Sequence, residues 1–337
     1  MIFMFNNLAV TIIILVVLVA SALFGWEHAP KKEEGPKTTG KLMKVARNYW
    51  PGQYWLAIAD KKGWLKEAGL NIEFTDFPDF IQSMSDMAEG KVDVSAFVLF
   101  DFMKFRLQGA DLVGVINNDI SFADAIVAKP GIENITDLKG KRIGLQKESF
   151  QEFMLSMVLE GNKLKLDDVI IAEIQAEDTE PFVKGAVDAT VTWEPFASEA
   201  VEKGNGRIIF DSSELPGLIS DIFVFRRKFI KERPEDVQAF VNVWHKSTEF
   251  IKQNPKEAFG IIAEIYNKTP GEVEALTRQV KILDMRDNRA SFSFAAGFES
   301  LHGTARKVNN FMIKKGMTKK RLDSTEFFDG RFIRRLR

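Results

Sequence analysis

The stretch Gly185-Ala-Val-Asp-Ala-Thr-Val-Thr-Trp193-Glu194-Pro195 has a counterpart about ninety-five residues earlier, Gly90-Lys-Val-Asp-Val-Ser-Ala-Phe97. In both, a glycine stands one residue before Val-Asp, and small and β-branched residues lead to an aromatic side chain. Such a glycine is typical of a helix end, where it adopts the left-handed conformation. The apolar run after it is typical of a buried strand. Unless so short a motif recurs by chance, the repeat predicts two similar α/β lobes.

The ends of these two strands are the first candidate binding surfaces. In an open α/β sheet, ligands bind beyond the carboxyl ends of the strands. We therefore expect Ser95–Phe97 and Thr192–Pro195 to lie at two strand ends that face each other across a cleft.

Length and composition narrow the class of protein. A chain of 337 residues suits two lobes better than one core. Lys and Arg number 46 and Asp and Glu 47, so the net charge of −1 favours no nucleic-acid partner. The absence of cysteine excludes disulfides and thiol catalysis. The histidines His28, His245 and His302 show no ligand spacing, and we expect no metal site and no cofactor.

The N-terminus predicts export from the cytoplasm. Residues Leu8 to Trp26 carry no charge and are long enough to span a membrane, and Ala20–Ala22 resembles a signal cleavage site. We expect residues 1–26 to be a signal peptide or a membrane anchor, with both alternatives open, and polar residues 27–40 to be a flexible linker. This arrangement places the folded body in the periplasm or at the outer face of the cell membrane, secreted or anchored.

Strand and helix patterns alternate through the body, which predicts mainly parallel sheets. The expected strands are Met43–Ala46, Asn71–Thr75, Val92–Ala96, Asp111–Ile116, Lys141–Leu145, Val169–Ile174, Asp188–Thr192, Arg207–Phe210 and Leu218–Arg226. We expect one helix over Tyr54–Glu67, an almost wholly helical chain after Pro234, and a solvated basic tail over Arg331–Arg337.

Two connections are expected to join the lobes, near Ala123–Ala128 and Asp221–Phe225. They predict a two-strand hinge that opens and closes around a ligand. Residues 41–124 and 222–337 would then form lobe 1, and residues 125–221 lobe 2.

An ordered set of short motifs resembles the solute-binding proteins of ABC importers, in the nitrate/sulfonate/taurine and thiamine-precursor branch. These motifs are Ala57–Trp64 with Glu67–Leu70, Gly90–Asp93, Asp124–Ala128, Ile135–Lys141, Gly185–Ala189 and Trp193–Pro195. The resemblance covers some two thirds of the chain. It implies an α/β fold of the type II periplasmic-binding class, capture of a small solute such as a taurine-like sulfonate or a pyrimidine, delivery to a membrane permease with its ATPase, and no catalysis.

The resemblance also implies which residues face the ligand. By position in the family's binding loops these are Asn48, Tyr49, Trp50, Gln53, Asp76, Phe77, Ser95, Phe97, Asp124, Glu148, Ser149, Trp193, Glu194 and Asp221. Several have structural alternatives: Tyr49, Trp50 and Phe77 could pack in the core, Asp124 could be a hinge residue, and Glu194 could cap the helix that begins at Pro195.

One departure from the family bears on the ligand. Members often have glycine before the serine at position 149, where helix amides bind an anion. Here the residue is Glu148, whose carboxylate would repel an anion. Together with Asp124, Glu194 and Asp221, and with Arg47 and Lys147 as the nearest expected cations, it favours a ligand that carries an amine or a ring with hydrogen-bond donors.

Two further functions remain as alternatives. The chain could be an enzyme on the same fold acting on a small nitrogen-containing metabolite, or a membrane-anchored ligand sensor. The sequence contains no Gly-x-Ser-x-Gly turn, no phosphate-binding glycine loop and no His-Glu-x-x-His motif. These absences favour the binding protein.

Overall fold

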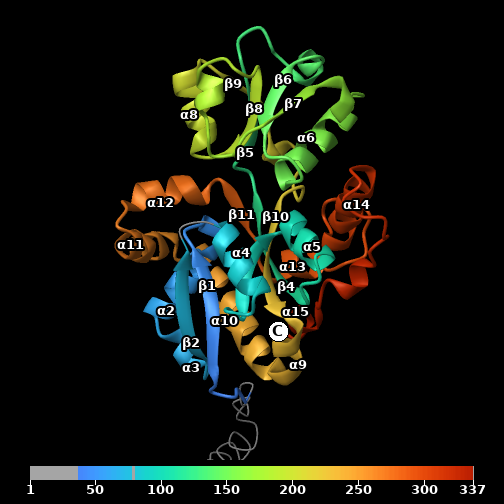
Figure 1. Ribbon diagram of the computed structural model, residues 1–337. Helices are drawn as coiled ribbons and strands as arrows, with labels where there is room; N and C mark the ends of the chain where they lie inside the picture. The colour runs from blue at the N-terminus through green and yellow to red at the C-terminus, as the bar shows by residue number, and fades with distance from the viewer. Residues whose placement is uncertain (1–36, 78–79, 337) are drawn as a thin grey trace, which may run out of the picture. The chain divides into compact units, whose positions relative to one another are not determined.

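The computed structural model describes residues 37–77 and 80–336 (Figure 1). The predicted signal peptide or anchor, residues 1–26, lies outside the described residues, as does the linker up to residue 36. Thr38 and Thr39, which we expected in a flexible linker, instead bond to the body. The Thr38 hydroxyl donates to the Gly69 carbonyl at 2.8 Å, and the Thr39 hydroxyl donates to the Asp236 carboxylate at 2.6 Å.

The first sheet has the strand order β11-β4-β10-β3-β1-β2. Its strands are β1 (Leu42–Asn48), β2 (Asn71–Phe77), β3 (Val94–Val98), β4 (Leu112–Ser121), β10 (Ser220–Arg226) and β11 (Val280–Ile282). β1 pairs in parallel with β2 and β3, whereas β10 runs antiparallel to both β3 and β4.

The second sheet has the order β7-β6-β8-β5-β9 (green to yellow in Figure 1). Its strands are β5 (Asp124–Ala128), β6 (Arg142–Leu145), β7 (Ile170–Glu173), β8 (Ala189–Trp193) and β9 (Arg207–Asp211). β6 is parallel to β7 and β8, and β5 runs antiparallel to β8 and β9. Apart from β11, the two sheets therefore share one order, with β5 in the place that β10 occupies in the first.

Helices follow most of the parallel strands. Those up to the second crossover are α2 (Tyr54–Lys61), α3 (Trp64–Glu67), α4 (Phe80–Ala88), α5 (Leu99–Leu107), α6 (Phe150–Gly161), α7 (Glu180–Val183) and α8 (Phe196–Gly204). After β10 come α9 (Arg227–Glu232), α10 (Pro234–Gln253), α11 (Pro255–Tyr266), α12 (Pro270–Thr277), α13 (Met285–Ser291), α14 (Leu301–Lys314) and α15 (Arg331–Arg334). Among the described residues, no helix has both the length and the hydrophobicity needed to cross a membrane.

The repeated Gly-x-Val-Asp motif makes the same contacts in both sheets. Gly90 and Gly185 have φ angles of 78° and 75°, and each ends its helix in the left-handed conformation. Asp93 then accepts a hydrogen bond from the Lys44 amide at 3.0 Å, and Asp188 accepts one from the Arg142 amide at 2.8 Å. The motif thus ends a helix and fixes the start of the neighbouring strand, which explains why the chain uses it twice.

Three expectations about secondary structure need correction. The expected helix over Tyr54–Glu67 is broken at Gly63, whose φ of 70° places it in the left-handed region. Strand β11 was not expected in the helical C-terminal part. The tail that follows Gly330 is not solvated, because it forms α15 and buries Phe332 and Ile333 against the core.

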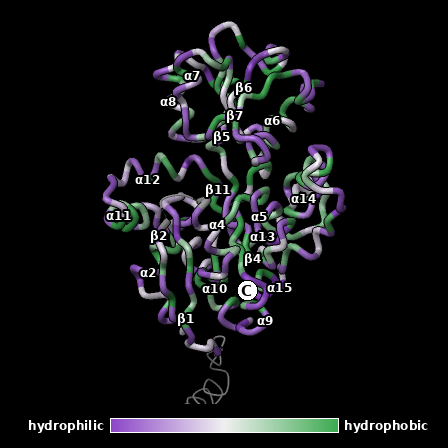
Figure 2. Tube along the Cα trace, viewed as in Figure 1, coloured by the Kyte–Doolittle hydropathy of each residue, from purple (hydrophilic) through white to green (hydrophobic). Residues whose placement is uncertain are grey.

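Aromatic side chains fill the core of the first sheet. The Trp55 ring lies 5.2 Å from the rings of both Phe223 and Phe240, and its indole nitrogen donates to Asn118 at 2.9 Å. Hydrophilic residues gather mainly on the outer helices and loops (Figure 2). This packing gives the strand ends of the first sheet a rigid base.

The chain crosses between the sheets twice, at residues 122–123 and again between β9 and β10. The two crossovers are bonded to each other. The Ser212 hydroxyl donates to the Ser121 carbonyl at 3.0 Å and accepts from the Asp124 amide at 3.3 Å. The Ser121 hydroxyl also donates to the Asp124 carboxylate at 2.6 Å. A change of angle in one crossover must therefore involve the other.

Candidate functional site

A cavity of about 490 Å³ lies where strand ends of both sheets meet the crossovers. Its wall is formed by Trp50, Met84, Val98, Asp101, Lys104, Phe105, Gln108, Ser121, Asp124, Gln146, Glu148, Ser149, Phe150, Gln175, Ala176, Glu177, Trp193, Ile219 and Asp221. A volume of this size suits a small organic molecule.

Aromatic rings form much of the wall on the second-sheet side. Trp193 stands at the end of β8, and its ring lies 5.8 Å from the ring of Phe150 at the start of α6. Trp50 lines the cavity from the loop after β1, and its indole nitrogen donates to Asp119 at 3.2 Å. These flat surfaces can hold a ring or an alkyl chain between the two sheets.

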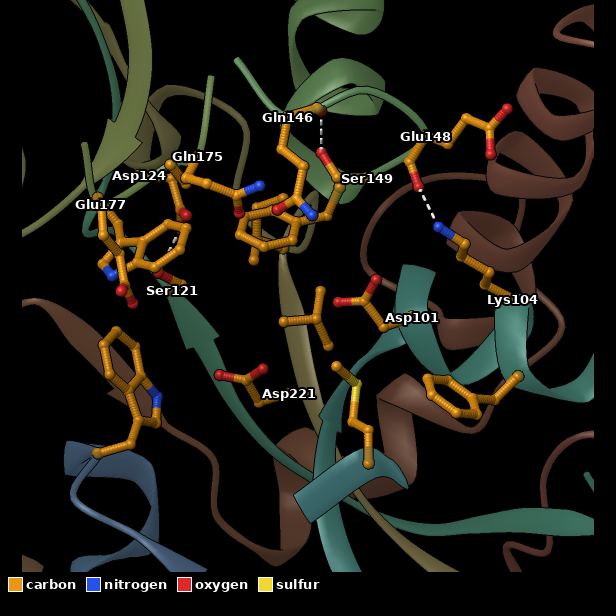
Figure 3. Close-up of a pocket in the computed structure, with 18 of the residues that line it drawn as sticks. Asp101, Lys104, Ser121, Asp124, Gln146, Glu148, Ser149, Gln175, Glu177 and Asp221 are labelled. Atoms are coloured by element: carbon orange, nitrogen blue, oxygen red, sulfur yellow. Dashed lines mark hydrogen bonds between the residues drawn. The ribbon is translucent and has the colours of Figure 1, made fainter. Parts of the chain in front are cut away.

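Carboxyl groups line the floor and the crossover. Figure 3 shows Asp101 and Asp221 projecting into the open space, with Asp124 beside Ser121. Asp119 lies next to Asp221 across the β4–β10 pairing, behind the wall. Asp119, Asp124 and Asp221 are nearly inaccessible to solvent.

Burial changes how these acids ionise, because it disfavours the charged form. Burial raises the pKa of Asp119 to about 7, although the hydrogen bonds from Trp50 and Asn118 act to lower it. It also raises the pKa of Asp124 to about 6 and that of Asp101 to about 6. The pKa of Asp221 is raised well above its usual value by burial and then by the charge of Asp119. The cavity therefore holds acids that change charge near neutral pH.

The N-terminus of α6 already uses its own chain's oxygens. The Glu148 amide donates to the Glu152 carboxylate at 2.8 Å, and the Gln151 amide donates to the Ser149 hydroxyl at 3.2 Å. The Lys147 amide faces the Glu173 carboxylate at 3.3 Å. Two internal carboxylates thus take the positions in which a sulfonate or nitrate would bind these amides.

Glu148 contributes backbone rather than charge to the wall. Its φ of 51° lies in the left-handed region, which glycine adopts without strain. Its carbonyl accepts a hydrogen bond from the Lys104 ammonium at 2.9 Å, and its carboxylate points away from the other labelled side chains (Figure 3). The carboxylate bonded to the Glu148 amide belongs to Glu152, four residues further along the chain, and it also pairs with Lys315 at 2.7 Å.

The structure brings six of the predicted ligand residues together at this cavity. They are Trp50, Asp124, Glu148, Ser149, Trp193 and Asp221. Asp124 belongs to the bonded crossover and also lines the cavity, so its position in the hinge is compatible with contact to a ligand.

The remaining predicted residues do not line this cavity. Gln53 is buried and its side-chain oxygen accepts from the Asn48 amide at 3.0 Å. The Tyr49 ring packs against the Tyr266 ring at a tilt of 53°, with ring centres 4.5 Å apart. Asp76 forms an ion pair with Arg47 at 2.7 Å. Arg47, one of the two cations expected near the ligand, is therefore already paired with a carboxylate.

Register explains the position of Ser95 and Phe97. β3 continues to Val98, so both residues lie inside the strand, paired with Val224 and Ile222 of β10. The strand end is reached at Val98, which does line the cavity.

Glu194 caps α8, as one of the two alternatives proposed. Its carboxylate accepts from the Ser198 amide at 3.1 Å and from the Ser198 hydroxyl at 3.0 Å. Phe77 ends β2, and its side chain lies outside the described part of the structure.

Sequence reasoning missed the polar residues Asp101, Lys104, Gln146, Gln175 and Glu177. Asp101 and Lys104 stand on α5, directly after the end of β3. The missed signal was the first turn of the helix after a strand, which projects over the same edge of the sheet.

Comparison with known proteins decides the family. Residues 50–258, more than half of the chain, match the family model described as NMT1/THI5 like. The chain belongs to the NMT1/THI5-like family. An aliphatic sulfonates-binding protein of Bacillus subtilis is 24% identical to this family member over 237 residues, which are 68% of this chain and 71% of the relative.

Solved structures agree with the predicted fold. The alkanesulfonate-binding protein SsuA of Xanthomonas axonopodis, bound to MOPS, superposes on this family member with a TM-score of 0.65 at 18% identity. The match covers 86% of this chain and 98% of that one. A Candida albicans protein described as having the generic periplasmic binding protein fold also gives 0.65, at 12% identity, over 86% and 96% of the two chains. The expected periplasmic-binding fold is therefore confirmed.

The family also contains a protein named as an enzyme. The 4-amino-5-hydroxymethyl-2-methylpyrimidine phosphate synthase of Candida albicans is 22% identical over 270 residues, covering 75% of this chain and 77% of the synthase. Membership of the NMT1/THI5-like family thus fits binding and also catalysis.

Proposed function

We propose that this protein is the extracytoplasmic solute-binding component of an ABC importer, and that it captures a small organic solute with nitrogen-bound hydrogen-bond donors. The observation that carries the proposal is the cavity itself, with aromatic rings on both sides and buried carboxyl groups at the floor and the crossover. The relatives named as sulfonate-binding proteins support the transport role.

The occupied α6 N-terminus supports a solute other than a simple oxyanion. Glu152 and Ser149 already accept hydrogen bonds from amides at this site. An amine or a pyrimidine-like ring would instead donate to the carboxyl groups and stack on Trp193. A taurine-like solute remains compatible through its amino group.

Hinge closure is the proposed mechanism. A solute that touches Trp50 from one side and Trp193 from the other gains contacts only when both sides are near it. Asp124 lies in the crossover and in the cavity wall, so a contact between Asp124 and the solute would act on a hydrogen-bonded residue of the hinge. Solute binding would then shift the population towards the closed form, which docks on a permease with its ATPase.

Residues 1–26 complete the proposal. They direct the chain across the membrane, and the protein acts in the periplasm or at the outer face of the cell membrane. The segment is either cleaved or retained as an anchor, and mass spectrometry of the mature protein distinguishes the two.

The test starts with native mass spectrometry of the protein purified without denaturant, to find and identify a carried solute. Trp193→Ala should weaken binding of that solute at least tenfold in calorimetry, about 1.4 kcal/mol, because the ring that stacks on it is lost. Trp64→Ala is the matched control, since this half-buried Trp packs on Phe250 and does not line the cavity. Equal affinities in the two variants would contradict the placement of the binding site.

Catalysis is the second candidate, because acids with a pKa of about 6 to 7 can transfer protons near neutral pH. The same sample decides between the two. A binding protein returns the solute unchanged after long incubation, whereas an enzyme converts it.

A further inference from the structure

We infer that Asp221, with Asp119 behind it, forms a subsite for a protonated amine of the solute. This inference rests on the proposed solute-binding function and names the charge of the solute that the cavity takes. It would make the ligand a cation held by carboxylates, with its carbon skeleton against the aromatic wall.

Asp221 is the group that points to a ligand. Its side chain lines the cavity and projects into the open space, although only 4% of the residue is exposed to solvent. Within the described part of the chain, its Oδ1 atom has no hydrogen-bond partner. A buried carboxyl oxygen without a partner loses its interaction with water and gains nothing in return. A donor brought by the solute would supply the missing bond.

The surroundings of Asp221 are strongly acidic. β4 brings Asp119 and the crossover brings Asp124. Helix α5 brings Asp101 and Lys104, and the second-sheet side brings Glu177. Glu148 lines the wall there with its backbone, and its carboxylate points away.

Lys104 is the one basic residue in the wall among the described residues, and its ammonium donates to the Glu148 carbonyl. Its positive charge remains in the wall, but its hydrogen bond to Glu148 directs it to the second-sheet side, and among the described residues no ion pair joins it to Asp221.

An ammonium group fits this position better than a metal ion or a hydroxyl group. Among the described residues, no group of three or more His, Cys, Asp or Glu side chains is arranged to hold a metal. A hydroxyl would complete one hydrogen bond but leave the carboxylate charge uncompensated. A protonated amine supplies both a donor and the opposite charge, and Trp50 or Trp193 can add a cation–π contact.

Binding of the amine must be coupled to loss of a proton. In the empty site, the charges of Asp119 and Asp221 repel each other, so burial keeps a proton on the pair near neutral pH. When the ammonium arrives, that proton leaves the carboxyl group for the solvent, and no covalent bond to the ligand forms. Lower pH protonates the carboxyl pair and therefore weakens binding of a cation.

The experiment compares three probes with one skeleton: benzylamine, benzyl alcohol and phenylmethanesulfonate. Titration calorimetry on the full protein, at pH 6 and pH 8, measures each affinity. We expect benzylamine to bind most tightly, with an affinity roughly tenfold higher at pH 8 than at pH 6, because Asp119, with a pKa of about 7, is mostly protonated at pH 6 and mostly ionised at pH 8. If binding releases a proton, the binding enthalpy of benzylamine measured at pH 6 should differ between buffers of different ionisation enthalpy.

Variants identify the carboxyl group. Asp221→Asn should lose at least tenfold in benzylamine affinity and most of the pH dependence. Asp111→Asn is the control, because Asp111 precedes β4 at the opposite end from Asp119 and pairs with Arg227 at 2.8 Å. If Asp221→Asn does not fold, the pH dependence and proton release of the unaltered protein still decide.

Several results would overturn the inference. They are equal affinity for the alcohol, tighter binding of the sulfonate, unchanged affinity in Asp221→Asn, or no benzylamine binding at pH 8. None of them removes the proposed function, which fails instead if the purified protein neither carries nor binds a solute of any charge.

Discussion

Replacing Asp119 by Asn should make the empty protein more stable at pH 8 and less stable at pH 4. Asp119 is fully buried beside Asp221 and accepts hydrogen bonds from Trp50 at 3.2 Å and Asn118 at 2.7 Å. Asparagine has nearly the same shape, so the substitution removes the charge while it leaves the packing in place.

The magnitude follows from the pKa of Asp119, which burial raises from an ordinary 3.8 to about 7. A carboxyl group whose pKa is raised on folding stabilises the fold least at high pH, where the folded state must bury its charge. A shift of about three units corresponds to about 4 kcal/mol at pH 8. Asparagine has one acceptor oxygen in place of two, so one of the two hydrogen bonds from Trp50 and Asn118 is lost, which costs about 1 kcal/mol.

The net expectation is a gain of about 2 to 3 kcal/mol at pH 8. At pH 4 the folded carboxyl group is protonated and the unfolded one, with a pKa of 3.8, is about half ionised, so the penalty for burying the charge is below about 1 kcal/mol. The lost hydrogen bond then outweighs this gain, and stability should fall by about 1 kcal/mol or less. Thermal or urea unfolding at both pH values measures the difference.

A matched control sharpens the test. The pKa of Asp111 is lowered because its pairs with Arg227 and Arg106 outweigh its partial burial, so Asp111→Asn should cost stability at pH 8 and not increase it. A loss of stability in Asp119→Asn at pH 8, or an equal change at both pH values, would refute the assignment of buried charge to this site.

Two further predictions concern packing. Gly52→Ala should lower the melting temperature by several degrees, because the added Cβ would stand 1.7 Å from an Asp119 carboxylate oxygen, and Asp119→Ala in the same chain should restore part of the loss. Additive losses would contradict this contact. Phe332→Ala should cost about 3 to 5 kcal/mol in urea unfolding, since the ring is fully buried at the C-terminus, whereas the half-exposed Arg335→Ala should change stability little. A loss below 1 kcal/mol for Phe332→Ala would support a solvated tail after all.

The sequence was sufficient to predict most of the strands, because each is a local pattern, and β11 (Val280–Ile282) is an exception. The paired motifs at Gly90 and Gly185 end a helix, start a strand and hold the adjacent strand through Asp93 and Asp188. The helix end and the strand start follow from short sequence spacing, whereas the contacts of Asp93 and Asp188, with amides 49 and 46 residues away, follow from the repeated topology.

The candidate site was less predictable, because it depends on distances that the sequence does not contain. Ser95 and Phe97 were placed at a strand end, but pairing with β10 carries β3 on to Val98, which stands opposite Asp221. The anion-excluding charge was expected on Glu148, whereas the helix turns Glu152 back onto the amide. A shift of one strand register or one helical turn is enough to exchange a wall residue for a core residue.

Both described ends of the chain belong to the first sheet's half. Thr39 is bonded to α10 through Asp236, α15 also packs against the first sheet, and residues 124–211 are inserted between β4 and β10. A fluorophore attached at either described end, near Thr39 or on α15, would therefore move with the same half and report nothing about closure. Because the chain contains no cysteine, one introduced thiol in each half, for example at the loop residue Asn205 and at Asn267, would give a distance reporter without background labelling.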